Sequence, residues 1–337
     1  MKQGFYLAFV YIGLVIGAGF ASGREIMEYF NFPSLTDHRG VVLATFLLIA
    51  VCYLVLRRAY LLQLTDCKEY LFAVVGKAAP LMHRFMMFYL FCGFFTMLSG
   101  CGALLSQSYM LPPLFGILLL LLLCFLVLSF DLKGIVALNA VLVPCMIAGI
   151  LLLCLDAILF QAVPTFSLRQ VTQGTLVSAI CYVSYNTVSA PSVLVPLQKD
   201  IAPKGILTAS VVGGFVLGFM ILLIWLCQSL HFDALRESEI PLLQLAAMSG
   251  RIQKHLYTLV LFMAICTTAV SQGFGFLASW KLTTFKKRVQ GAFLFCLIAF
   301  PFSLLGFSGL VANLYSFFGI LGLIWMVWVF VDYYRKG

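Results

Sequence analysis

Long apolar segments alternate with short polar connections along almost the whole chain. A helix needs about 20 apolar residues to cross the hydrocarbon core of a bilayer. The pattern predicts ten such spans, at residues 4–31, 40–62, 80–108, 112–130, 134–160, 171–198, 204–230, 252–282, 288–306 and 308–333. The longest connections, 57–84 and 231–251, are too short for a soluble domain.

Composition indicates an all-α polytopic membrane protein. Of the 337 residues, 63% are hydrophobic and 10% are charged, which is too little charge to cover a soluble surface. Unbroken apolar runs such as 114–130 are unlike the alternating strands of a membrane β-barrel. The net charge of +9 lies mostly in short loops, where membrane topology places it, so a nucleic-acid partner is not expected.

The distribution of lysine and arginine predicts how the spans are oriented. These residues concentrate in one alternate set of loops, which also includes both ends of the chain. Because positive loops stay in the cytoplasm, both termini are expected there, in a multi-pass protein of the cytoplasmic (inner) membrane. The first apolar stretch continues past its small residues to Phe32, so we interpret it as a retained span rather than a signal peptide.

Two of the predicted spans are interrupted at matching places. The first contains three glycines, a serine and two charges within 17–25, and the sixth is interrupted at 184–191, half a chain later. Each half has five spans, an odd number, so residues 1–160 and 161–337 are expected to form two five-helix repeats of opposite topology. Matched discontinuous helices 1 and 6 in inverted repeats indicate the central site of a secondary transporter.

The two interruptions supply the candidate substrate-binding residues. Amide groups freed in the first break suit a carboxylate, and carbonyls freed one turn before Pro191 suit an amine. The candidates are Gly17, Ala18, Gly19, Phe20, Ala21, Ser22, Gly23, Tyr182, Tyr185, Asn186 and Thr187. The alternatives are a glycine-rich face for helix packing in the first span and an ordinary proline kink in the sixth.

The eighth span carries several hydroxyl groups between Ala264 and Gln272. Hydroxyl and carbonyl oxygens are the ligands that hard cations prefer. Serine and threonine in a helix also bond to their own backbone, and for this segment taken alone that explanation is the better one. The eleven cysteines show neither CxxC nor Cys/His metal spacing and are interpreted as small core residues.

Two motifs resemble a known transporter architecture. Gly13-x-x-x-Gly17-x-Gly19, together with Ala264-x-x-Thr267-Thr268, resembles the sodium site of the leucine-transporter fold. The ten-span layout looks like the amino acid–polyamine–organocation superfamily. More closely, the segment 15–26 resembles the YkvI-type family of uncharacterised bacterial membrane proteins, which implies a fold and a class but no substrate.

The resemblance implies roles for further residues. It implies a Na⁺ site made by the backbone carbonyls of Gly13, Ile16 and Ala264 and the hydroxyls of Thr267 and Thr268. A second sodium site is not expected, because Phe20 or Ala21 stands where such transporters carry asparagine. The tenth span offers Asn313 and no acid in its outer half to pair with a gate arginine. Arg24 is therefore expected to pair with Glu28, or with an acid in the possible lid at 231–251.

Taken together, the sequence predicts a transporter rather than an enzyme, since no hydrolase, metalloprotease or nucleotide-binding motif is present. We expect Na⁺-coupled symport of a small amino acid or related zwitterion between 18–22 and 182–187, with H⁺ as the other possible coupling ion. No other cofactor is expected, and the partners are a small-molecule substrate and the lipid bilayer. A receptor-like nutrient or germinant sensor and a solute channel are the alternatives.

Overall fold

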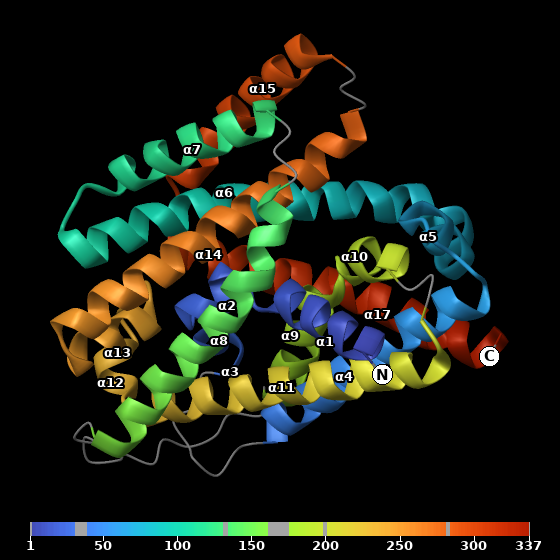
Figure 1. Cartoon of the computed structure of the whole chain (residues 1–337), viewed down its shortest axis with the longest axis horizontal. Helices are drawn as coiled ribbons and strands as arrows, with labels where there is room; N and C mark the ends of the chain where they lie inside the picture. The colour runs from blue at the N-terminus through green and yellow to red at the C-terminus, as the bar shows by residue number, and fades with distance from the viewer. Residues whose placement is uncertain are drawn as a thin grey trace.

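The computed structural model describes residues 2–30, 39–130, 134–160, 175–197, 201–280 and 284–336. These residues form helices and connecting turns, without a strand among them. The helices run roughly along one axis of an elongated bundle, and both termini lie toward the same end of it (Figure 1). The predicted all-α architecture is therefore confirmed, while the predicted repeat boundary between residues 160 and 161 falls beside the undescribed residues 161–174 and stays a prediction.

Six helical segments are long and apolar enough to cross a bilayer, judged by length and composition. They are Arg39–Leu61, Cys67–Tyr109, Pro113–Phe130, Pro203–Leu230, Arg251–Trp280 and Phe307–Arg335. Two shorter apolar helices, Gln3–Val15 and Val143–Leu159, accompany them in the described part of the chain. These segments support a multi-pass membrane protein, and the total of ten spans stays a prediction.

The first predicted span is interrupted twice. It comprises α1 (Lys2–Val15), α2 (Ala18–Ser22) and α3 (Arg24–Phe30). Gly17 between α1 and α2 is extended, with φ −94° and ψ −173°. Gly23 between α2 and α3 is left-handed, with φ +76°, a conformation that glycine adopts without steric penalty. The predicted discontinuity of this helix is confirmed.

The sixth predicted span consists of α9 (Thr175–Thr187) and α10 (Ala190–Leu197), which are separated by a turn at Val188 and Ser189. Pro191 lies in the first turn of α10, where its missing N–H removes no helical hydrogen bond. The proline therefore starts the second half-helix instead of kinking a continuous one, and this predicted break is also confirmed.

The remaining segments complete the bundle. They are α4 (Arg39–Leu61), α5 (Cys67–Val75), α6 (Ala79–Tyr109), α7 (Pro113–Phe130), α8 (Gly134–Phe160), α11 (Pro203–Leu230), α14 (Arg251–Leu277), α15 (Phe285–Ser303), α16 (Phe307–Leu310) and α17 (Ser316–Lys336). Two short helices, α12 (Phe232–Leu235) and α13 (Pro241–Ser249), occupy the connection that the sequence marks as a possible lid. A π-helical turn, η3 (Val311–Tyr315), interrupts the tenth predicted span between α16 and α17.

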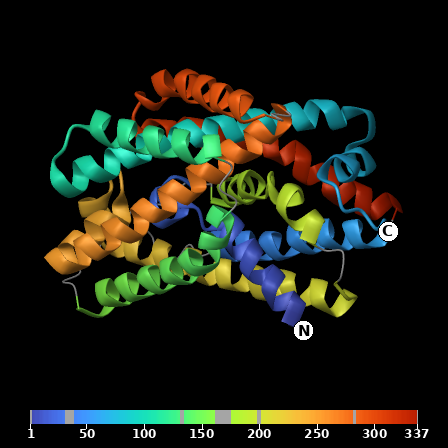
Figure 2. The same ribbon diagram turned by 45° about the horizontal axis from the view of Figure 1, so that its top comes forward.

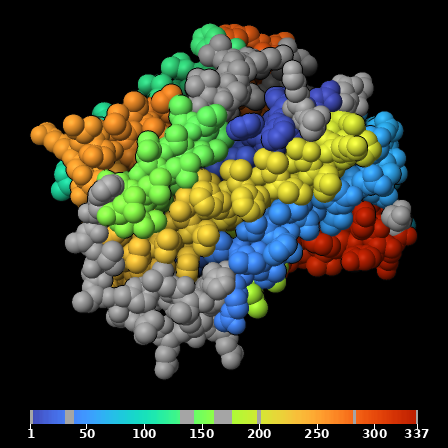
Figure 3. Space-filling view, turned by 60° about the horizontal axis from the view of Figure 1, so that its bottom comes forward, coloured from blue at the N-terminus to red at the C-terminus, as the bar shows by residue number. Residues whose placement is uncertain are grey.

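The broken parts of the interrupted helices lie inside the bundle, whereas Phe5, Tyr6 and Phe9 of α1 are exposed at its surface. In Figures 1 and 2, α7 and α15 form an outer layer on α6 and α14, and α1 lies on the other side of that pair. On the opposite face, α8, α11 and α4 run side by side, with α17 beyond α4 (Figure 3). Glycines in α11 permit this contact, since a Cβ on Gly218 would lie 2.1 Å from Thr45 Oγ1 and one on Gly214 would lie 2.4 Å from Ile49 Cγ1.

Candidate functional site

The two helix breaks are brought together at the centre of the protein. Helix α3 packs against α9, and α1 packs against α10. All five residues of α2 are buried, as are Tyr182, Tyr185, Asn186 and Thr187 at the end of α9. The residues predicted from two distant parts of the sequence therefore belong to one buried region.

Side chains from other helices hold the backbone of the first break. Gln228 Nε2 donates a hydrogen bond of 2.7 Å to the carbonyl of Gly23, and the Tyr257 hydroxyl donates one of 2.7 Å to the carbonyl of Ala21. The Ser22 hydroxyl donates to the carbonyl of Gly19 at 2.6 Å and accepts from the Arg24 amide at 3.1 Å. Irregular backbone at membrane depth needs such internal partners, because lipid provides none.

Glu25, in the first turn of α3, is buried to a relative exposure of 4%. Its carboxyl group lies over Gly19, where an added Cβ would be 2.0 Å from Oε1. The other oxygen, Oε2, has no hydrogen-bond partner, and no ion pair among the described residues involves Glu25. An unsatisfied buried acceptor costs about 1–3 kcal/mol, and a charged one costs more. The site therefore contains a buried carboxyl group that has no cationic partner among the described residues.

Tyrosines from four elements surround this carboxyl group. Five of them interact electrostatically with Glu25, and we call them the tyrosine cluster: Tyr29 of α3, Tyr89 of α6, Tyr182 and Tyr185 of α9, and Tyr315 of η3. Tyr185 is the cluster member that affects the carboxyl group of Glu25 most directly. The cluster thus joins both broken helices to the π-helical turn and to α6.

The rings of the tyrosine cluster pack on one another. Tyr185 stacks on Tyr315 with ring centroids 4.3 Å apart, and the Tyr89 ring lies 5.7 Å from Tyr185. The Tyr29 hydroxyl donates a 2.5 Å hydrogen bond to the carbonyl of Tyr315, and its ring meets Tyr182 edge-on at 5.4 Å. The Tyr182 hydroxyl is buried and has no partner. Glu25 Oε2 and Arg24 Nε are further buried polar atoms of this region without a hydrogen-bond partner.

Asn186 and Thr187, two of the predicted substrate residues, bond to the backbone of their own helix. The Asn186 amide donates to the carbonyl of Tyr182 at 3.0 Å, and the Thr187 hydroxyl donates to the carbonyl of Val183 at 2.8 Å. Both side chains bond to their own helix one turn back, as residues beside a helix break commonly do. Their predicted contact with an amine stays a prediction, whereas Tyr182 and Tyr185 face the charged centre.

The residues of the predicted cation site lie where α1, α2 and α14 meet. Helix α14 packs against α2, and a Cβ on Gly17 would be 3.7 Å from Thr268 Oγ1. The Thr267 hydroxyl donates to the carbonyl of Ala264 at 3.1 Å. Gly13, one turn before Gly17, faces Val143 of α8, and Ile16 is the buried residue at the end of α1. Thr268 is therefore next to the first break, and the assignment of the five residues to a Na⁺ site stays a prediction.

The predicted gate residues form an ion pair. Arg24 and Glu28 lie one helical turn apart, with 2.6 Å between Nη2 and Oε1. Arg24 Nη1 also donates to the carbonyl of Ser238, between α12 and α13, at 3.3 Å. Gln107 of α6 binds the same segment, donating to the Ser238 hydroxyl at 3.0 Å and accepting from the Ile240 amide at 3.1 Å. One end of the site is thereby covered by the α12–α13 segment.

Sequence reasoning assigned no role to four residues that form this centre. The sequence could have indicated Glu25, because an acid inside an apolar span is costly and usually functional. It could also have indicated Tyr29, which lies one helical turn later and so on the same face as Glu25. Tyr89 and Tyr315 carried no local signal. They reach the site only because α6 and η3 pack against the two breaks.

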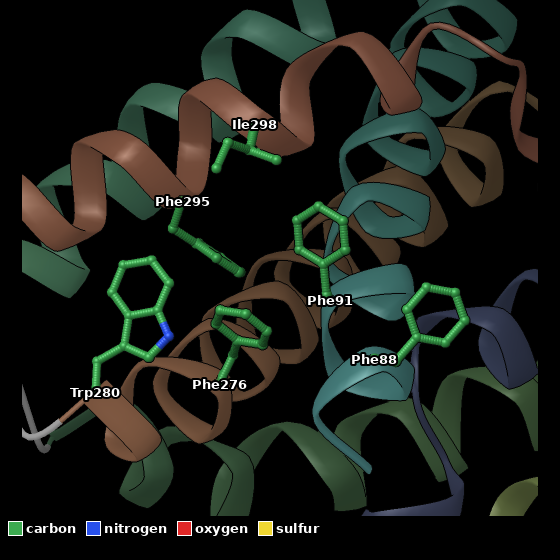
Figure 4. A pocket seen from close by; sticks show the side chains of 6 residues that line it. All are labelled: Phe88, Phe91, Phe276, Trp280, Phe295 and Ile298. Atoms are coloured by element: carbon green, nitrogen blue, oxygen red, sulfur yellow. The ribbon is translucent and has the colours of Figure 1, made fainter. Parts of the chain in front are cut away.

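A separate pocket of about 340 Å³ lies between α6, α15 and the end of α14 (Figure 4). Its lining is entirely apolar: Phe88, Phe91, Phe276, Trp280, Phe295 and Ile298. Without a polar group it offers no means of orienting a polar solute. We therefore place the functional site at the helix breaks.

Comparison with known proteins identifies two relatives in Bacillus subtilis (strain 168). The chain is 29% identical over 320 residues to the uncharacterised protein YyaD, covering 94% of this chain and 93% of the relative. It is 27% identical over 331 residues to the uncharacterised membrane protein YkvI, covering 94% and 92%. A comparison with protein-family profiles finds no match. The expected resemblance to YkvI-type proteins is confirmed over nearly the whole chain.

Solved structures share the fold. An inward-facing conformation of Mhp1 superposes with a TM-score of 0.60 at 12% identity, covering 95% of this chain and 73% of the other. The Eremococcus coleocola manganese transporter gives 0.56 at 15% identity, covering 97% and 78%. A Na⁺-coupled sialic acid symporter gives 0.53 at 15% identity, covering 95% and 78%. At such low identity these likenesses establish the leucine-transporter fold and leave the substrate open.

Proposed function

We propose that this protein, which has the leucine-transporter fold and is homologous to YkvI over nearly its whole length, is a secondary active transporter. Its solute is a small amino acid or a related zwitterion. The observation that carries the proposal is the meeting of two interrupted helices, α1–α3 and α9–α10, at one buried polar centre. Discontinuous helices at such a depth are tolerated where they line a solute or ion site.

Sodium is the proposed coupling ion. Its site comprises the carbonyls of Gly13, Ile16 and Ala264 and the hydroxyls of Thr267 and Thr268. The proximity of Thr268 to Gly17 and of Thr267 to the carbonyl of Ala264 supports this set. Because the ion joins α1 and α14, its binding favours one arrangement of the first break relative to α14, and the substrate binds to that arrangement. H⁺ is the alternative coupling ion.

The solute binds between Ala18–Ser22 and Tyr182–Thr187, beneath the segment α12–α13. Closure on this side uses Arg24, Glu28 and the backbone of Ser238. Helix α13 also packs closely against the turn at Gly23, between α2 and α3, since a Cβ on Gly23 would lie 2.7 Å from Leu242 Cγ. Movement of α12–α13 away from α2 and α3 would open the site toward the side that the charge distribution predicts to be outside.

A binding screen tests the proposal across the whole proposed class of solutes. The purified full-length protein is heated with each of the common amino acids in NaCl or in KCl of equal concentration. At least one amino acid should raise the unfolding midpoint, and more so in NaCl, because a ligand that binds only the folded state stabilises it by mass action. Absence of any shift across the screen contradicts the proposed substrate class.

The double substitution T267A/T268A tests the ion site. Removing both hydroxyls should abolish the sodium dependence of that shift, because the remaining carbonyls are too few to hold the ion. The matched control is T208A, which removes a half-buried hydroxyl of α11 that donates to the carbonyl of Lys204 in its own helix. An unchanged sodium dependence in T267A/T268A overturns the assignment of these threonines.

Net flux separates the transporter from the other two functions that the fold permits. A sensor binds the amino acid without moving it across reconstituted vesicles. A channel passes it downhill without saturation. A secondary transporter accumulates it saturably in response to an ion gradient.

A further inference from the structure

The most unusual feature of the site is the uncompensated carboxyl group of Glu25. Asp332 is buried to a similar extent, at 5% exposure, but Arg58 pairs with it. Glu28, one turn from Arg24, is paired too. Glu25 has no such partner among the described residues, and its Oε2 accepts no hydrogen bond. An ionisable side chain inside a membrane-spanning segment is costly and typically marks the path of a substrate or an ion.

The groups around Glu25 restrict what that ligand can be. Those that interact with it are the five phenols of the tyrosine cluster, which are neutral donors and acceptors with aromatic faces. Aromatic faces attract organic cations, and clustered rings form cages for ammonium groups. Of the possible solutes, a cation alone would favour the ionised form of the buried carboxyl group and gain a charge-assisted contact from it.

A metal cation fits this centre less well than an ammonium group. Hard cations are typically held by about six oxygen ligands. Here the buried side-chain oxygens without a partner are Glu25 Oε2 and the Tyr182 hydroxyl, while the Tyr29 hydroxyl already donates to the carbonyl of Tyr315. A primary ammonium group has three N–H donors. Two of them can bond to Glu25 Oε2 and the Tyr182 hydroxyl, while the aromatic rings pack around the group.

We propose that Glu25 and the tyrosine cluster bind the ammonium group of the transported solute, so that the solute must carry a primary ammonium group. Glu25 accepts its hydrogen bonds and balances its charge, and the rings of Tyr182 and Tyr185 enclose it. The inference rests on the proposed function in placing this centre on the transport route. The binding of an ammonium group is a separate claim that needs no flux to be tested.

The test compares matched ligands on the full-length protein at pH 7 in KCl. Ethanolamine and phenethylamine are the cationic probes. Ethylene glycol and 2-phenylethanol, in which a hydroxyl replaces the ammonium group, are their neutral counterparts. At least one amine should raise the unfolding midpoint saturably, while its neutral counterpart and additional KCl at the same ionic strength should not. Equal shifts with amine and alcohol, an equal shift with additional KCl, or no shift with either amine overturn the proposal.

Glu25→Gln identifies the residue responsible, because it removes the charge and keeps the shape. The amine concentration that gives half the maximal shift should rise by about tenfold or more, which corresponds to one lost charge-assisted contact. Without ligand, E25Q should unfold at about the same temperature as the unmodified protein, because a buried carboxyl group without a cation is held as its neutral form and the amide has the same shape. The control E69Q makes the same change at the exposed start of α5 and should alter neither quantity.

These results separate the inference from the proposed function. Amine-selective binding lost in E25Q, but without uptake into vesicles, supports the inference and contradicts transport. Concentrative uptake of a solute that lacks an ammonium group, unchanged in E25Q, supports transport and contradicts the inference. If E25Q does not fold, the selectivity of the unmodified protein for amine over alcohol still decides the matter.

Discussion

At the scale of single residues, Gly23 decides which way the charges of α3 point. Its left-handed conformation ends α2 and starts α3 in a new direction. Arg24 then joins Glu28 and Ser238, whereas the next residue, Glu25, turns back over Gly19. Arg24 therefore belongs to the contacts that cover the site, and Glu25 belongs to the buried centre.

Gly23→Ala should destabilise the protein by about 1–2 kcal/mol from the left-handed backbone alone. The added Cβ would also lie 2.6 Å from Gln228 Nε2 and 2.7 Å from Leu242 Cγ, so the true loss should be larger. The matched control is G149A in α8, where nothing lies within 4 Å of the new Cβ. The thermal midpoint of G149A should be unchanged or raised.

A G23A protein as stable as G149A would show that the backbone at this position relaxes freely. Gly23 would then not determine the turn between α2 and α3, and the directions of the Arg24 and Glu25 side chains would need another cause.

Some of these residue contacts were predictable, and others were not. Arg24 and Glu28 are four residues apart on one helix, so their pairing follows from helical spacing. The orientation of the Glu25 side chain does not follow from helical spacing. The left-handed Gly23 starts α3 in a new direction, so the side-chain positions of α3 cannot be extrapolated from those of α1. Its tyrosine neighbours come from α6, α9 and η3 as well as α3, and only tertiary packing brings them together.

At the scale of elements, the two predicted breaks follow from residues with strong backbone preferences, namely the glycines of 17–23 and Pro191. The third irregularity, η3, was not predicted. Its residues, 311–315, include neither glycine nor proline, and a π-turn has no clear composition of its own. Its effect on the site is direct, since it presents the carbonyl of Tyr315 to Tyr29.

A buried ion pair joins α4 to α17. Arg58 Nε lies 2.5 Å from Asp332 Oδ2, and Nη2 donates to Oδ1 at 3.2 Å. Tyr70 interacts electrostatically with both residues. Because either charge alone would be left buried without its partner, D332N should destabilise the protein by about 3 kcal/mol or more.

The double variant R58M/D332N is the comparison that isolates this effect. It removes the orphaned charge as well, so its thermal midpoint should lie above that of D332N. A double variant less stable than D332N would mean that the pair contributes through packing of the arginine side chain and not through charge.

At the scale of the whole molecule, the leucine-transporter fold could be inferred from span number, matched interruptions and two motifs. An odd number of predicted spans per half implies opposite insertion of the two halves, and this inverted arrangement stays a prediction. The layering did not follow from sequence, because apolar spans reveal little about which neighbours they contact. That α7 and α15 lie outside α6 and α14 emerges only from the packed bundle (Figure 1).

The closing contacts also belong to the whole molecule. Residues of α3, α6, α11 and α14 converge on the first break and on the segment between α12 and α13: Arg24, Gln107, Gln228 and Tyr257. Opening on this side must exchange several of these hydrogen bonds together, which favours a discrete rearrangement over gradual widening.

Concentrative uptake decides whether this protein is a secondary active transporter. The protein is reconstituted into vesicles loaded with KCl and diluted into NaCl with a mixture of radiolabelled amino acids, in parallel with protein-free vesicles. We expect at least one amino acid to accumulate inside above its external concentration and to leave again when an ionophore dissipates the sodium gradient. Amino acids that never exceed the external concentration, under either a sodium or a proton gradient, would contradict transport.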